Sequence, residues 1–223
     1  MIGSEIGGVL VVLAPDLPGR WTGNPPLLGR LTAALEERVR GPVRVTVMDR
    51  SLIRVAGPGG VRRCRVSASH EAGRVGLAVA PPADPPADPA SGPATRIGFD
   101  LCGPGRETSI GSALPLVLTD AERDLLRRTV PRTPGAGPLH GSVAWDPAMV
   151  WTAVEALTKL AGVRLLTPTT RPRLTGADPL RATAVTLTHH SFDGLTGCVA
   201  VGRPPCSSAF SPTSERNLSC VSS

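Results

Sequence analysis

Aromatic side chains are scarce in this chain: they make up 3% of its 223 residues, and tyrosine is absent. Proteins that hold RNA or single-stranded DNA stack the bases on aromatic side chains, so this composition argues against such a surface. Lysine and arginine outnumber aspartate and glutamate by 24 to 18, but the basic residues are spread along the chain instead of forming one stripe. We therefore expect no nucleic-acid partner.

Long hydrophobic runs are also missing. The apolar run at residues 6–13 has no basic segment before it and is too short to cross a bilayer, so we expect it to be a buried strand. The 5 cysteines form no Cys-x-x-Cys pair, and their odd number favours a reducing compartment over a disulfide framework. These features predict a cytoplasmic protein without a membrane partner.

Helix and strand signals alternate along the chain. Apolar spacing and capping signals predict helices at residues 27–39, 119–128 and 147–161, the last with Asp146 as its N-cap and Gly162 after its final turn. Short β-rich runs predict strands at residues 43–48, 51–56, 61–66, 74–80, 95–101, 163–166, 182–187 and 196–201. The Ser67–His70 segment is expected to form a polar turn before the strand at 74–80.

A proline-rich stretch divides the chain, because six prolines in fourteen residues exclude a helix or a central strand. Residues 66–80 resemble residues 187–202, which indicates two similar α+β halves. Each half is expected to be a small, mostly antiparallel sheet packed against a long helix, and two fused halves favour a monomer. The predicted parts are an N-terminal half, a linker or exposed loop, a C-terminal half and a disordered tail, at residues 1–80, 81–94, 95–202 and 203–223.

Two carboxylates stand where chemistry is expected. Asp100 ends an apolar strand shortly before a Gly-Pro-Gly turn, at a strand mouth where sites commonly form, although a carboxylate that binds loop amides fits the same pattern. Glu155 shares one helix face with Trp151 and Lys159, which lie four residues to either side. The alternative there is an ion pair between Glu155 and Lys159, which would contribute only about 0.3–0.5 kcal/mol.

Taken in order, three segments resemble the signature of the 4′-phosphopantetheinyl transferase superfamily, in the larger, two-halved form associated with secondary metabolism. They are Ser67-Ala68-Ser69-His70, Gly98-Phe99-Asp100-Leu101-Cys102 and Trp151-Thr152-Ala153-Val154-Glu155-Ala156-Leu157-Thr158-Lys159. The resemblance covers roughly residues 66–202. It implies an α+β fold made of a pseudo-twofold pair of similar halves.

The resemblance also implies a reaction: transfer of phosphopantetheine from coenzyme A to a serine of an apo acyl or peptidyl carrier protein, in polyketide or nonribosomal peptide biosynthesis. Asp100 and Glu155 would hold Mg²⁺, a cation that prefers carboxylate and water oxygens. Glu155 would take the proton from the attacking serine hydroxyl. Lys159 would offset phosphate charge, and Ser69 and His70 would contact coenzyme A.

Two positions depart from that signature. Cys102 stands where the family has a second carboxylate, and Val154 stands where it has a lysine before the catalytic glutamate. One alternative keeps the fold and changes the reaction, to a cyclisation or dehydration of carrier-linked or coenzyme A-linked intermediates, with Cys102 as nucleophile or acid–base group. In the competing interpretation Cys102 is an inert thiol. A catalytically silent binding module is a third class.

Overall fold

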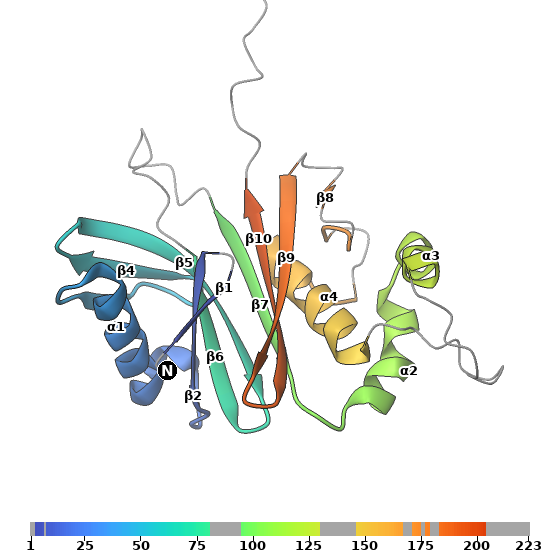
Figure 1. The fold of residues 1–223 in the computed structure, drawn as a ribbon, viewed down its shortest axis with the longest axis horizontal. Helices are drawn as coiled ribbons and strands as arrows, with labels where there is room; N and C mark the ends of the chain where they lie inside the picture. The colour runs from blue at the N-terminus through green and yellow to red at the C-terminus, as the bar shows by residue number, and fades with distance from the viewer. Residues whose placement is uncertain are drawn as a thin grey trace, which may run out of the picture.

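Two antiparallel sheets share a hydrophobic core at the centre of the molecule, and helices cover their outer faces (Figure 1). This computed structural model describes residues 3–6, 8–80, 95–129, 146–166, 171–174, 177–178 and 183–203. The fold is therefore a mixed α+β fold, as expected from the sequence. The predicted linker at 81–94 and the predicted tail beyond Arg203 lie outside the described residues. In the part of the chain that is described, no helix is both long and apolar enough to cross a membrane.

Helix α1 (Pro25–Val39) covers the outer face of the first sheet. It begins at Asn24, whose side-chain oxygen accepts the backbone N–H of Leu27 at 2.9 Å. Leu27, Leu31 and Leu35 recur at helical spacing and are buried against the sheet, which confirms the predicted helix. A short 3₁₀ helix (Trp21–Gly23) precedes it. The strands lie in the order β1-β2-β6-β5-β4-β3, and their bounds are β1 Ser4–Ile6, β2 Val9–Pro15, β3 Arg44–Val47, β4 Leu52–Gly57, β5 Gly60–Glu71 and β6 Arg74–Val79.

Helix α4 (Pro147–Ala161) covers the outer face of the second sheet. The predicted caps are confirmed: the Asp146 side chain accepts the N–H of Ala148 at 2.9 Å, and Gly162 ends the helix at φ 69°. The strands lie in the order β7-β10-β9-β8, with bounds β7 Arg96–Cys102, β8 Ala177–Asp178, β9 Thr183–Phe192 and β10 Leu195–Arg203. Two further helices, α2 (Glu107–Val117) and α3 (Asp120–Thr129), lie beside α4.

The two sheets repeat one arrangement. In each, a strand leads to a helix and then to a hairpin whose second strand pairs with the first strand, which gives the orders β2-β6-β5 and β7-β10-β9. Both hairpins turn on two residues with positive φ, Ala72-Gly73 and Asp193-Gly194, as a type I′ turn requires. The similar sequences at 66–80 and 187–202 fall on these two hairpins.

The start of α3 is fixed by a buried ion pair. The Thr119 hydroxyl accepts the N–H of Glu122 at 3.3 Å, and the Glu122 carboxylate accepts the N–H of Thr119 at 3.0 Å, so the expected capping box is present. Arg171 also donates two hydrogen bonds to the Glu122 carboxylate, at 2.6 and 2.7 Å, although both side chains are almost fully buried. These bonds hold residues 171–174 against the helix.

Three sequence predictions are wrong. No strand forms at 163–166, because the N–H of Val163 bonds to the carbonyl of Thr158 and closes the end of α4. The Ser67–His70 segment is not a turn; it lies inside β5, the longest strand of the first sheet. The run at 6–13 is divided between β1 and β2, because Gly8 turns the chain at φ 83°. Helix α2 and strand β8 were not expected at all.

Candidate active site at the junction of β5, β7 and α4

A glycine brings α4 into direct contact with β7. A Cβ atom placed on Gly98 would lie 1.8 Å from the carbonyl oxygen of Ala156 and 2.7 Å from the nitrogen of Leu160. Only a residue without a side chain allows this approach. Asp100 lies two residues further along the strand and therefore points to the same face of β7 as Gly98, toward α4.

Serine side chains join β5 to β7 where no ladder connects the two strands. The hydroxyl of Ser67 accepts the N–H of Phe99 at 3.0 Å, and the hydroxyl of Ser69 accepts the N–H of Leu101 at 3.2 Å. The Ser69 hydroxyl also donates to Oδ1 of Asp100 at 2.7 Å. Ser69 is buried, and its hydroxyl is fully used in holding the strand and the carboxylate.

Lys159 connects α4 to both strands. Its ammonium group donates to Oδ1 of Asp100 at 2.7 Å, to the carbonyl of Phe99 at 3.0 Å and to the carbonyl of Ala68 at 3.2 Å. The three donors of the ammonium are thereby occupied. Lys159 forms its ion pair with Asp100 and not with Glu155, so the simple ion pair within the helix is not the arrangement found.

Both carboxyl groups of the cluster have a raised pKa. Burial raises the pKa of Asp100, while Lys159 and Ser69 act in the opposite direction. Burial also raises the pKa of Glu155, and the negative charge of Asp100 raises it further. Desolvated carboxyl groups with a raised pKa are common at catalytic sites, because burial and a neighbouring negative charge both disfavour the ionised form.

Asp100 and Glu155 provide a donor set that suits Mg²⁺ only in part. Every side-chain hydrogen bond found for Asp100 is made at Oδ1. Among the described residues, no three His, Cys, Asp or Glu side chains are grouped so as to hold a metal ion. Mg²⁺ is nevertheless often held by one or two carboxylates together with water and substrate phosphates. A Mg²⁺ ion held by Asp100 and Glu155 would have to take its remaining ligands from water and a phosphate substrate.

Cysteine thiols beside the cluster are neutral. Cys102 is 2% exposed, and burial followed by the charge of Glu71 raises the pKa of its thiol to about 11. Its sulfur lies 3.5 Å from the carbonyl oxygen of Gly103. Cys198, opposite Asp100 in the β7–β10 ladder, is fully buried, and burial raises its pKa to about 12. A thiol is nucleophilic as the thiolate, so neither cysteine is activated here.

The sequence interpretation missed two charged residues at this junction, Glu71 and Arg106. Arg106 donates to Oε2 of Glu71 at 2.8 Å, and Glu71 is the charged group with the largest effect on the Cys102 thiol. Ser67, Ser69 and Glu71 alternate along β5 and share one face. That alternation is a strand signal, and the prediction of a turn at Ser67–His70 does not take it into account.

His70 does not join the cluster. Because it follows Ser69 in a strand, its side chain points to the opposite face of β5. Its Nδ1 lies 3.0 Å from Oδ1 of Asp16, and the side chain is exposed. The structure thus brings together Ser69, Asp100, Glu155 and Lys159.

Comparisons with known proteins add no family. No protein-family model matches the chain, and no curated protein matches its sequence.

Proposed function

We propose that this protein transfers phosphopantetheine from coenzyme A to a serine of an apo carrier protein, with Mg²⁺ as cofactor. The observation that carries the proposal is the meeting of the three signature segments. Ser69, Asp100 and Lys159 lie 31 and 59 residues apart in the chain, yet their side chains form one hydrogen-bonded cluster beside Glu155. A chance likeness of three short motifs would not require them to meet.

The repeated arrangement of the sheets also supports the proposal. The resemblance implies two halves related by a pseudo-twofold axis, and the matching strand orders and type I′ hairpins are what such a pair would have. In this interpretation Asp100 belongs to the first strand of the second half. The candidate site then lies where the halves meet, which is a common place for a ligand site.

The reaction assigns a role to each side chain. The serine oxygen forms a bond to the phosphorus that carries pantetheine, the bond from that phosphorus to the bridging oxygen breaks, and adenosine 3′,5′-bisphosphate leaves with the electron pair. Glu155 accepts the hydroxyl proton; its raised pKa makes it a stronger base than an exposed glutamate. Lys159 keeps Asp100 in place, and both carboxylates would hold Mg²⁺, which supplies positive charge to the diphosphate.

Glu71 and Arg106 offer replacements for the two residues missing from the signature. The Glu71 carboxylate lies near Cys102, where the family has its second carboxylate. Arg106 is half exposed beside it and can contribute the positive charge that Val154, a buried core residue, does not. Arginine also binds phosphate oxygens in a bidentate manner.

The test is intact-protein mass spectrometry of an apo carrier protein incubated with this protein, coenzyme A and Mg²⁺. We expect a mass gain of one phosphopantetheine per carrier. Glu155→Gln should slow the gain by about a hundredfold or more, the usual contribution of a general base. Glu37→Gln makes the same change at an exposed position of α1 and should leave the rate unchanged. Absence of any gain with several carrier proteins would refute the proposal.

The alternative reaction with Cys102 as nucleophile is tested in the same assay. Its neutral, buried thiol favours the inert interpretation. Cys102→Ser should therefore retain the mass gain. Loss of activity in Cys102→Ser, with coenzyme A binding intact, would favour the repurposed reaction instead.

A further inference from the structure

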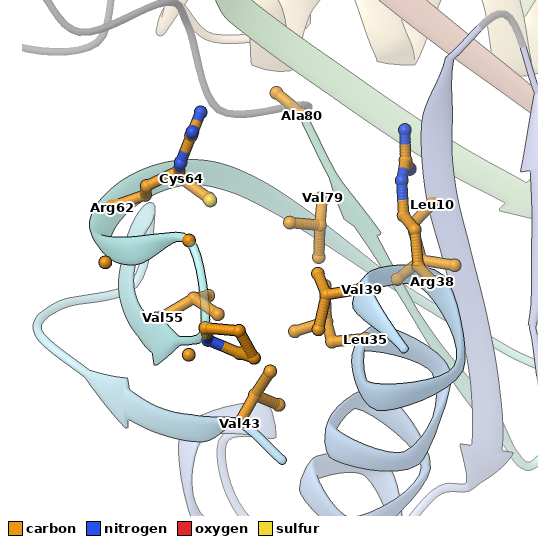
Figure 2. Close-up of a pocket in the computed structure, with 14 residues that line it drawn as sticks. Leu10, Leu35, Arg38, Val39, Val43, Val55, Arg62, Cys64, Val79 and Ala80 are labelled. Carbon is orange, nitrogen blue, oxygen red and sulfur yellow. The ribbon is translucent and has the colours of Figure 1, made fainter. Parts of the chain in front are cut away.

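A cavity of about 290 Å³ opens in the first sheet, lined by residues that take no part in the Asp100 cluster (Figure 2). It exists because α1 ends at Val39, where Arg40 takes a left-handed conformation at φ 53°, while β4 and β5 continue to their hairpin. The face of the hairpin that continues the α1-covered face of the sheet, called its inner face here because it lines the cavity, is therefore left without a helix to cover it. Its walls are aliphatic, formed mainly by Leu35, Val39, Val43, Val55, Val79 and Leu10.

Two arginines flank this aliphatic space, and none of the described residues that line it is acidic. Figure 2 shows Arg38 of α1 and Arg62 of β5 on opposite sides of the cavity. Arg62 stands opposite Val55 in the β4–β5 ladder, so it lies on the inner face of the sheet. No ion pair to Arg62 is found among the described residues, whereas Arg38 lies 3.5 Å from a carboxylate oxygen of Glu5.

The positive charge of both arginines acts on a thiol in the cavity wall. Burial raises the pKa of the Cys64 thiol to about 11, and the charges of Arg62 and Arg38 act against that rise. Cys64 lies on the same inner face of β5, two residues from Arg62. An apolar space with positive charge at its edge is complementary to a molecule with an apolar body and one anionic end.

We propose that this cavity binds an unbranched aliphatic chain that ends in a carboxylate or phosphate, with the chain against the valines and the anionic head between Arg62 and Arg38. Its size sets the length of the chain. A water molecule occupies about 30 Å³ of the liquid, and a methylene group is of similar size. A cavity of 290 Å³ therefore holds a chain of roughly ten such groups. A medium-length fatty carboxylate is the matching free ligand, and an alkyl phosphate has the same chemistry. The proposal does not depend on the transferase reaction.

Isothermal titration calorimetry of the full chain with sodium hexanoate, octanoate, decanoate and dodecanoate tests the length. Each methylene buried should tighten binding by up to about fourfold. The gain should stop near ten groups, where the cavity is full. Affinity that keeps rising through dodecanoate, or no saturable binding below the aggregation concentration, would overturn the proposal.

The head group is tested by exchanging it and by removing its partner. Decanol should bind at least tenfold more weakly than decanoate, since hydrogen bonds to charged groups contribute more than neutral ones. Arg62→Gln should weaken decanoate by about tenfold. Arg63→Gln is the matched control, because Arg63 is the next residue of the same strand and lies on the face turned away from α1, opposite Arg54. Equal affinities of the two variants would show that the head group is not held by Arg62.

One further variant and one further ligand complete the test. Val39→Phe narrows the cavity from an exposed wall position, 45% accessible, and should weaken decanoate by at least tenfold without unfolding the protein, as a thermal melt will show. Unchanged binding in this variant would place the ligand elsewhere.

Monodecyl phosphate distinguishes the two sources of the anionic head: tighter binding than decanoate assigns the site to a phosphate, and weaker binding assigns it to a carboxylate.

Discussion

Replacing Gly98 by alanine tests the contact on which the candidate site depends. The added Cβ would lie 1.8 Å from the carbonyl oxygen of Ala156, and the atoms it meets belong to the backbone of α4, so no side chain can turn away. Strand and helix must separate by roughly 1.5 Å to restore an ordinary contact distance. Gaps of this size remove much of the dispersion energy across the layer, and overpacking typically costs about 1–3 kcal/mol. We expect the free energy of unfolding to fall by an amount near the upper end of this range, about 3 kcal/mol.

A loss of that size should lower the melting temperature by roughly 6–12 °C in a chain of this length, measured by differential scanning calorimetry. The separation would also move Lys159 away from Asp100, so the proposed transferase activity should fall together with stability. Gly111→Ala is the control: the same change in the exposed part of α2 meets nothing within 4 Å and should stabilise by up to about 1 kcal/mol. If Gly98→Ala melts at the wild-type temperature, α4 does not approach β7 as described.

Other substitutions test the charges. Lys159→Met leaves the buried Asp100 carboxylate without its cation and should lower the free energy of unfolding by about 3 kcal/mol in urea titrations, a loss that Asp100→Asn should partly restore. Burial and the charge of Asp100 raise the pKa of Glu155, so stability falls as the pH rises through that raised value. Glu155→Gln removes this fall in stability. The free energy of unfolding of the variant should exceed that of the wild type by about 0.5–1 kcal/mol at neutral pH and should equal it near pH 4. A variant that is less stable than the wild type at neutral pH would contradict the assignment. Arg171→Met leaves buried Glu122 unpaired and should lower the free energy of unfolding by roughly 3–5 kcal/mol. Adding Glu122→Leu to this variant should recover most of the loss. Equal losses in the single and the double variant would show that the ion pair is not the cause.

Charge is one property that the sequence alone misrepresented. Basic residues are dispersed along the chain, but alternation in the three neighbouring strands β3, β4 and β5 places four of them on the face that is turned away from α1. Arg54 lies directly opposite Arg63 in the ladder. The others on this face are Arg44 and Arg65. A linear scan sees their spacing, whereas only the strand register shows that they share a face.

Local signals were enough to predict α1, α3 and α4. Asn24, Asp146 and Gly162 act on backbone groups within a few residues, and apolar periodicity selects the buried face of α1. Such interactions are complete once a short segment has folded, so they can be predicted from that segment. The prediction of a strand at 163–166 was wrong because the closing bond of α4 takes the N–H of Val163, which a propensity scan does not count.

The junction of β5, β7 and α4 was decided by tertiary structure. Ser69 and Lys159 could be singled out in the sequence, but their shared partner, Asp100, depends on how two sheets and a helix pack. The contribution of Glu71 and the open cavity beneath Arg62 arise in the same way. These features join residues that are distant in the chain, and the geometry that brings them together is set by the packed layers as a whole, not by any one segment.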